Sequence, residues 1–306
     1  MNDHNPQANT FQVHVRAVRP DDQARILTLL DQTRRQMLSF GAEDLPTLLT
    51  SDQTNGAVAE TGPLLWGFLL TTLLAQPALP TEATETWAAW RGCALLSGWR
   101  ADEGLPALWE PVRAALSARQ VRSVVHIAAA AWLHEPLQRL GFQISDTLEV
   151  LQRGVGIDHA TDGAGPATLR PARPDEITGL QAVDSAAFAP PWRATAAELT
   201  SLLVMSSHAV VGEVDGRVLG YAVSDVRGEF GTLARLAVHP AAQGQGLGRQ
   251  LLTDALRFCR RSGARSVSLN TNESNQAAQR LYAQLGFRLI GRRTPVMTLR
   301  LPRLNR

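Results

Sequence analysis

The sequence predicts an α/β (α+β) protein of two tandem domains, each with a mixed, mostly antiparallel sheet flanked by helices. Two observations predict this fold class. Three short stretches recur in the same order in both halves, and strand-like and helix-like segments alternate in an order that a doubly wound parallel sheet does not have. The 306 residues suffice for two domains, and 44% hydrophobic with 19% charged residues is typical of a globular protein.

The internal repeat has three landmarks. Val15–Asp22 reappears as Leu169–Glu176, Arg122–Val125 as Arg265–Ser268, and Leu140–Phe142 as Leu285–Phe287. Between the copies, residues 154–166 hold four glycines, one proline and two aspartates, the composition of a flexible linker. We therefore expect a first domain at 1–153, a linker at 154–166 and a second domain at 167–306.

The elements are clearest in the second copy. The pattern predicts a strand at 167–172, a helix from 174, a helix near 195–205 and three strands at about 208–214, 217–225 and 229–239. A long helix at 246–263 and a strand at 266–271 follow. The last helix has an apolar stripe at 278–285, and two final strands lie at 288–290 and 296–301. Asp215 and Gly216 indicate a hairpin turn between two of the strands. Gly286 follows the last helix at the position that favours a left-handed residue.

Composition excludes several classes of site. All 30 basic residues are arginines, which rules out a Walker-type phosphate lysine and a Schiff-base lysine. The net charge is only +2, and the arginines occur in short groups such as Arg260 and Arg261. We therefore expect no nucleic-acid partner. Cys93 and Cys259 have no metal-binding or CxxC spacing, so we expect two reduced thiols and no metal.

No segment predicts export or a membrane span. Residues 1–10 lack the basic-then-apolar pattern of a signal peptide, and the apolar stretch at 64–75 is too short to cross a bilayer. We expect a cytoplasmic protein without a membrane partner.

A glycine-rich loop lies between a predicted strand and a predicted helix. Its residues, Gln243-Gly244-Gln245-Gly246-Leu247-Gly248, can turn several backbone N–H groups toward a ligand because glycine accepts a positive φ. The helix that begins there adds its positive dipole end, which suits a diphosphate. The spacing differs from the GxGxxG dinucleotide pattern, and a simple tight turn would look similar.

With the residues downstream, the second copy resembles the GNAT superfamily of N-acetyltransferases. Leu236-Ala-Val-His-Pro240 followed by Gln243, Gly246 and Gly248 is similar to the family's first signature. The chain also resembles the family's second signature at every defined position, with Asn275, Ala278, Leu281, Tyr282, Gly286 and Phe287. The resemblance covers about residues 167–301 and implies acetyl-CoA as the co-substrate.

The resemblance implies a role for each residue. Backbone groups of Leu236 and Val238 would pair with the pantetheine arm, and an N–H near Leu236 would polarise the thioester carbonyl. Amides from Gln243 to Arg249 would hold the pyrophosphate, and Asn275 would meet the pantetheine or its adenine-side linker. Tyr282 would protonate the departing thiolate, although it also shares a helical apolar stripe with Leu281 and Leu285.

The general base is open. Related families place a glutamate where this chain has Asn270, which cannot serve as a base. Glu229 and His239 are candidates, but a surface carboxylate at a strand end is the commoner explanation for Glu229, and an exposed turn is favoured for His239 because Pro240 follows it. A chain of water molecules is a third route.

The first copy has different residues at the corresponding positions. Alignment on the Arg-Ser-Val landmark sets Arg100, Glu103 and Leu105 against Gln243, Gly246 and Gly248. Alignment on Leu-Gly-Phe sets Ala130 against Asn275 and Leu137 against Tyr282. We therefore expect a degenerate first domain. It holds six of the seven tryptophans, for which core packing is favoured over an acceptor pocket or an interdomain surface.

The sequence thus predicts transfer of an acetyl group to a primary amine by direct attack on the thioester. The tandem arrangement resembles mycothiol synthases, and the second copy resembles enzymes that acetylate protein amino termini, so the acceptor is a small molecule or a peptide. A non-catalytic acyl-CoA sensor and a scaffold stay as alternatives. The oligomeric state is open between a monomer with pseudo-dimeric halves and a homodimer.

Overall fold

The computed structural model describes residues 13–74, 85–156 and 165–302. The first ten residues and most of the expected linker lie outside these ranges. The chain forms two compact units: unit 1 holds the described residues 13–73, 85–143 and 297–302, and unit 2 holds 144–156 and 165–296, besides residue 74. No described helix is long and apolar enough to cross a membrane.

Unit 1 is built on a mixed sheet in the order β1-β3-β4-β5-β6-β13, with β2 beside β5. Strands β5 and β6 are parallel, and β1, β3, β4 and β5 are joined antiparallel in turn. The elements are β1 His14–Ala17, α1 Gln23–Gln32, β2 Gln36–Leu38, α2 Leu45–Thr50, β3 Thr54–Thr61, β4 Leu64–Leu73, β5 Thr86–Leu95, α3 Ala101–Ala118, β6 Val121–Ile127 and α4 His134–Arg139.

Unit 2 repeats this plan in the order β13-β7-β12-β11-β10-β9-β8. Strands β11 and β12 are parallel, and β8 to β11 form an antiparallel series. The elements are β7 Gln143–Gly154, β8 Thr168–Pro171, α5 Ile177–Ala187, α6 Ala196–Met205, β9 His208–Val214, β10 Arg217–Arg227, β11 Phe230–Val238, α7 Leu247–Arg261, β12 Ser266–Asn272, α8 Gln276–Gln284 and β13 Arg288–Arg300.

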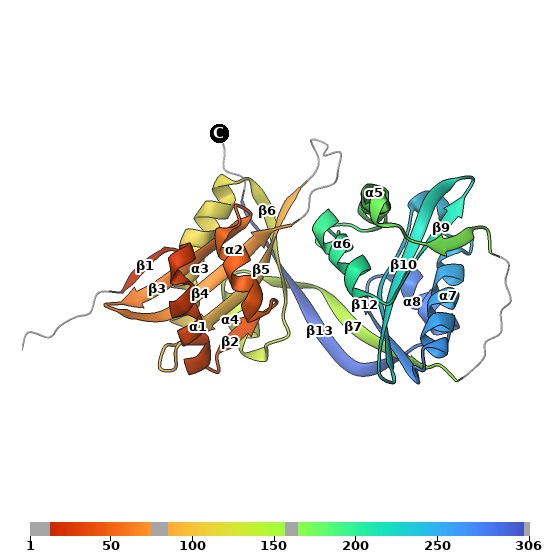
Figure 1. Cartoon of the computed structure of the whole chain (residues 1–306). Coiled ribbons are helices and arrows are strands. Elements are labelled where there is room, and N and C mark those ends of the chain that lie inside the picture. The colour runs from red at the N-terminus through yellow and green to blue at the C-terminus, as the bar shows by residue number, and fades with distance from the viewer. Residues whose placement is uncertain (1–12, 75–84, 157–164, 303–306) are drawn as a thin grey trace, which may run out of the picture. The chain divides into compact units, whose positions relative to one another are not determined.

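Helices cover both faces of the unit 2 sheet (Figure 1). Helices α7 and α8 pack on one face around Leu251, Leu256 and Leu269. Helices α5 and α6 pack on the other around Leu180, Leu199 and residues of β9 to β11. The strand series and both helical layers confirm the mixed α/β class that the sequence predicts.

An ion-pair network repeats with the fold. In unit 1, Arg16 of β1 binds Asp22 through two 2.7 Å hydrogen bonds and also contacts Glu60 of β3. In unit 2, Arg170 of β8 binds Glu176 in the turn after β8, and it also binds Glu213 of β9, in the same arrangement. The hydrogen bond from Arg170 lowers the pKa of Glu176 to about 2. The first sequence landmark is therefore a strand arginine that ties each unit's first turn to its sheet.

The tryptophans and cysteines behave as the sequence predicts. Trp66, Trp90 and Trp109 are at most 3% exposed in the core of unit 1. Cys93 and Cys259 are buried free thiols, and burial raises the pKa of Cys259 to about 11. Core packing thus explains the buried aromatic residues, and neither thiol is poised to react.

The end of the chain corrects one expectation. The two final strands predicted at 288–290 and 296–301 are a single strand, β13. Gly291 (φ +85°) and Pro295 lie between the two predicted strands. In the structure the backbone continues through both, because β13 serves both units: residues 288–296 belong to unit 2 and residues 297–300 to unit 1.

The two halves of the sequence therefore exchange their last strands. Met297 and Leu301 lie in the core of unit 1 with Phe142, and the Leu301 N–H donates to the Arg122 carbonyl (2.9 Å). Strand β7, which ends the first repeat, pairs with β12 of unit 2. The units divide at 143/144 and 296/297, and the described residues of the expected linker, 154–156 and 165–166, lie within unit 2.

Strand exchange predicts that a residue near the carboxyl end of the chain stabilises unit 1. Met297 is 1% exposed, so Met297→Ala should lower the free energy of unfolding by about 2–4 kcal/mol. Leu289→Ala, on the same strand but 45% exposed, should change it by less than about 0.5 kcal/mol. Urea unfolding followed by tryptophan fluorescence measures this, since six of seven tryptophans lie at 66–132. Equal losses in the two variants would contradict the exchange.

Candidate functional site

The central feature of unit 2 is a gap between two parallel strands. Strands β11 and β12 pair only from Phe230/Ser266 to Thr232/Ser268. Strand β11 then continues to Val238 along β10, while β12 continues to Asn272 along β7. Between the diverging strands, the edge of β11 is open to an extended ligand that could add to the sheet.

Leu236 and Val238 face this gap with their backbone groups. The His239 N–H donates to the Leu219 carbonyl (2.8 Å), which places the groups of His239 toward β10. In an antiparallel pair the direction alternates with each residue, so Ala237 also bonds toward β10. The backbone groups of Leu236 and Val238 therefore point to the other edge, where β12 has diverged.

The glycine loop lies at the end of β11. Gly244 (φ +75°) and Gly246 (φ +93°) adopt the left-handed conformation, and Gly246 is the N-cap of α7. Gln243, Gly244, Gln245 and Gly246 are all exposed. Gly248 lies between Leu281 of α8 and Val238, since a Cβ there would be in ordinary contact with both, at 3.4 and 3.6 Å. The loop is thus an exposed backbone surface at a helix N-terminus.

Side chains around the loop are partly engaged. Gln243 donates to the Val238 carbonyl (2.9 Å), and Gln245 donates to the Ala241 carbonyl (2.9 Å). Leu247 is fully buried, so only its backbone can serve a ligand. Arg249 donates to Gln284 at the end of α8 (3.0 Å). The structure therefore brings the loop and α8 together, as the two signatures require.

Helix α8 carries the other two predicted residues. The Asn275 side chain is exposed and accepts a hydrogen bond from the Ala278 N–H (3.2 Å), so it caps α8. Tyr282 is 7% exposed and packs edge-on against Phe287, with ring centroids 5.8 Å apart. Within the described part of the chain, no group hydrogen-bonds its hydroxyl. Burial raises the pKa of Tyr282 to about 12, so the phenol stays protonated through neutral pH.

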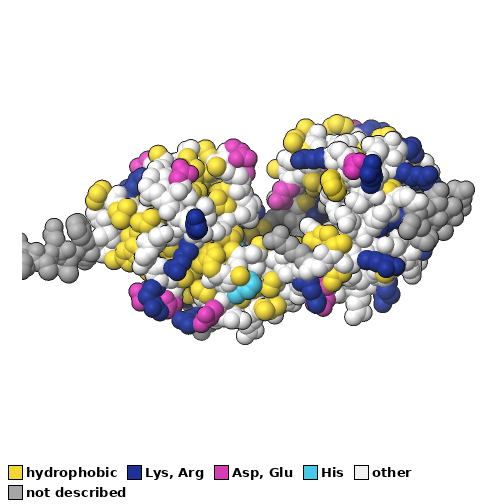
Figure 2. Space-filling view, turned by 90° about the horizontal axis from the view of Figure 1, so that it is seen from below, with side chains coloured by type: hydrophobic (Ala, Val, Ile, Leu, Met, Phe, Trp, Pro, Cys, Tyr) yellow, Lys and Arg dark blue, Asp and Glu magenta, His cyan; other side chains and the backbone are white. Residues whose placement is uncertain are grey.

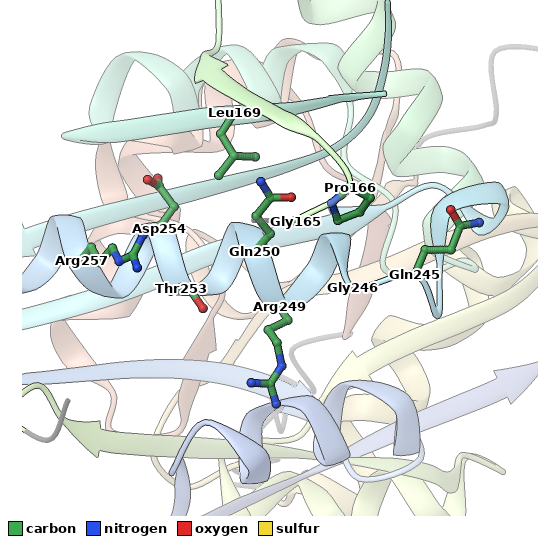
Figure 3. A pocket seen from close by; sticks show the side chains of 10 residues that line it. All are labelled: Gly165, Pro166, Leu169, Gln245, Gly246, Arg249, Gln250, Thr253, Asp254 and Arg257. Carbon is green, nitrogen blue, oxygen red and sulfur yellow. The ribbon is translucent and has the colours of Figure 1, made fainter. Parts of the chain in front are cut away.

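A cavity of about 260 Å³ borders the loop on the side of α7 that faces the start of β8 (Figure 3). Its lining includes Gln245, Gly246 and Arg249, and sequence reasoning missed Thr253, Asp254 and Arg257 further along the helix. Gln250 joins the two walls, because its amide bonds both the N–H and the carbonyl of Ala167. Arg249 points away from this wall toward α8 (Figure 3).

None of the residues considered for the general base places a carboxylate in the gap. Glu229 is exposed and paired with Arg265 (2.9 Å) at the far end of β11. His239 accepts a hydrogen bond from the Ala241 N–H and caps the following turn. Asn270 is exposed on β12. The described residues include no group of three metal-ligating side chains either.

A buried ion pair that the sequence did not predict fixes the loop between α5 and α6. Arg235 of β11 donates to both oxygens of the fully buried Asp184 of α5 (2.5 and 2.8 Å) and to the Trp192 carbonyl (2.7 Å). Its guanidinium lies 4.3 Å from the centre of the Phe188 ring. Asp184 also accepts from the Tyr221 hydroxyl (2.5 Å). Arg235 is adjacent to Leu236 and thus ties the Phe188–Trp192 loop to the strand that borders the gap.

The corresponding junction in unit 1 has another construction. Arg100 is the N-cap of α3, so the structure matches it to Gly246 and not to Gln243 as the sequence alignment did. The shift of three residues arises because α3 has 18 residues and α7 has 15. Arg100 pairs with Asp102 and Glu103 in the first turn. Trp99 stacks on Trp66 at 3.8 Å in the preceding loop.

Comparison with known proteins agrees with this geometry. Residues 178–287 match the Acetyltransferase (GNAT) family. Unit 2 therefore carries a GNAT N-acetyltransferase domain. The whole chain has the fold of a tandem GNAT protein from the clavulanic acid biosynthesis pathway, with a TM-score of 0.59, 15% identity and coverage of 96% of this chain and 100% of that one.

Two curated relatives are similar to part of this chain. A mycothiol acetyltransferase of Tsukamurella paurometabola is 32% identical over 193 residues, which cover 54% of this chain and 65% of that protein. A Bacillus subtilis protein named for ribosomal protein bS18-alanine N-acetyltransferase activity is 29% identical over 121 residues, which cover 40% of this chain and 80% of that protein. This chain therefore aligns with just under two thirds of the first relative. GNAT acetyltransferases use acetyl-CoA.

The positive φ of Gly246 gives a test of the loop. Gly246→Ala should cost about 1–2 kcal/mol of stability through backbone strain and should also weaken acetyl-CoA binding. Gly263→Ala is the matched control, since Gly263 has φ +86° and open space at the other end of α7. Thermal unfolding with and without acetyl-CoA separates the two effects. A ligand-induced Tm shift that survives equally in both variants would contradict a coenzyme role for the loop.

Proposed function

We propose that the chain transfers the acetyl group of acetyl-CoA to a primary amine at one site, in the gap between β11 and β12 of unit 2. The observation that carries the proposal is the meeting of three features at this gap: an unpaired strand edge, an exposed glycine loop at a helix N-terminus, and the Tyr282 helix. The fit to a coenzyme is chemical, because the gap offers sheet-type hydrogen bonds for the amide-bearing arm and the loop offers N–H groups for a diphosphate.

Each group has a step in direct attack on the thioester. The Leu236 N–H polarises the carbonyl and stabilises the negative charge that develops on its oxygen. The Tyr282 hydroxyl donates a hydrogen bond to the departing sulfur. A pKa of about 12 lies well above the value near 8.5 of a free thiol, so full proton transfer from Tyr282 is more uphill than the sequence suggested. Stabilisation by a hydrogen bond is the role that this environment favours.

The acceptor enters from the face covered by α5 and α6. The Phe188–Trp192 loop is the part of this face that Arg235 fixes beside the gap. The relatives' names point to two acceptor chemistries, a small thiol-containing molecule and a peptide amino terminus. This loop, Phe-Ala-Pro-Pro-Trp, contains no acidic side chain, so we propose an amine acceptor that is uncharged or weakly charged. Across the face of the molecule drawn in Figure 2, basic and acidic side chains are scattered among neutral ones.

Unit 1 has no second coenzyme site in this proposal. The first turn of α3, at the positive end of the helix dipole, already carries Asp102 and Glu103. These two carboxylates would repel a diphosphate. Ala130 and Leu137 stand at the positions of Asn275 and Tyr282, and Leu137 is fully buried. We propose that unit 1 is a degenerate copy.

The second candidate is an acyl-CoA sensor without turnover. The absence of a carboxylate base among the described residues of the gap favours it. Release of free thiol from acetyl-CoA, measured with a panel of small amines, aminothiols and peptides with free amino termini, separates the two functions. Binding without release across the panel would favour the sensor.

Tyr282→Phe tests the mechanism. The variant keeps the ring packing on Phe287 and loses only the hydroxyl, so kcat should fall about 100-fold while the acetyl-CoA dissociation constant changes by less than about twofold. Because the pKa of Tyr282 is about 12, wild-type kcat should rise as the amine deprotonates and then stay level to about pH 10. Equal losses of kcat and of binding would make Tyr282 a structural residue.

A further inference from the structure

Strand β7 is part of unit 2 although it belongs to the first repeat. It follows the Leu140–Phe142 landmark of the first half and precedes residues 157–164. Its residues 148–154 pair antiparallel with the whole of β12, from Leu148/Asn272 to Gly154/Ser266. Side chains alternate along a strand, so Glu149, Leu151 and Arg153 share one face. Leu151 lies in the core beneath α7 and α8, which places all three on the α8 side.

Asp146 organises the turn before α8. Its carboxylate accepts from the Asn272 amide (2.7 Å) and from the Ser274 hydroxyl (2.6 Å). The Glu273 N–H donates to the carbonyl of the next β7 residue, Thr147 (2.8 Å). This turn leads directly into Asn275, the N-cap of α8.

Two further side chains of β7 hold α8 along its length. Glu149, 8% exposed, accepts from Gln279 in the first turn (2.9 Å) and pairs with Arg293 of β13 (3.2 Å). Arg153, also 8% exposed, donates to the Leu285 carbonyl at the carboxyl end of α8 (2.5 Å). Tyr282 lies midway, three residues from each contact point.

We infer that β7 is the support that fixes α8 against the coenzyme gap, with Arg153 and Glu149 as positioning residues for Tyr282. The inference rests on the proposed role of Tyr282 and gives the first repeat a function in the reaction without a site of its own. A charged hydrogen bond to a helix carbonyl in a buried setting is strong and directional, so it sets the position of the helix end. Glu149 is not the missing base, because it faces α8 and is held by Gln279 and Arg293.

The test uses the full chain and three variants. Arg153→Met removes the donor to Leu285, and Arg153→Lys retains a donor at the same place. Arg170→Met is the control, because Arg170 also anchors neighbouring chain through charged hydrogen bonds, to Glu176 and Glu213, but from β8 at the other edge of the unit 2 sheet. Hydrogen–deuterium exchange of peptides covering 276–287 reports the position of α8 independently of activity, and steady-state kinetics reports kcat and KM.

Arg153→Met should speed exchange across 276–285 about tenfold and lower kcat about 10- to 100-fold, with KM for acetyl-CoA changed by less than about threefold. Arg153→Lys should recover most of both losses, and Arg170→Met should leave both as in the wild type. Unchanged exchange in Arg153→Met overturns the inference. Faster exchange with unchanged kcat, in an assay where Tyr282→Phe is impaired, overturns the positioning of Tyr282. If the wild type acetylates no amine, the proposed function fails, while the exchange data still decide whether β7 holds α8.

Discussion

The separation of β11 from β12 after three residue pairs is the constraint on which unit 2 depends. Two parallel strands that stay paired would satisfy each other's backbone groups and leave nothing for a ligand. Here each strand keeps a different partner, β10 for β11 and β7 for β12, so the sheet stays intact on both sides of the gap. The glycine loop, the Tyr282 helix and the loop held by Arg235 all lie at the borders of this opening.

The exchange of strands links the gap in unit 2 to both halves of the chain. Where β12 leaves β11, it keeps β7 as a partner along its full length, and β7 is encoded in the first half. In return, residues 297–301 complete the core of unit 1. Neither half of the sequence holds a complete unit, so the first half is required for the packing of unit 2 whether or not it binds a ligand of its own.

Much of this arrangement is predictable from local patterns. The repeat, the mixed α/β class, helix α6 with its Thr195 cap, and strand β9 follow the sequence closely, because short-range periodicity and turn residues determine them. The glycine loop likewise lies between a strand and a helix, as the sequence predicts. Long-range features could not be predicted in this way. The single strand β13 replaces two predicted strands because its two ends belong to different units, and the contacts of Asp184 with Arg235 join residues 51 positions apart. The position of β7 depends on which strands pair with each other over long range, and the hydrophobic pattern alone does not determine that pairing.

The central claim is that two similar units carry one coenzyme site. Isothermal titration calorimetry of the full chain with acetyl-CoA tests it most directly, because stoichiometry does not depend on knowing the acceptor. The account predicts one molecule bound per chain, whatever the oligomeric state. Two molecules bound per chain, or none, would contradict it.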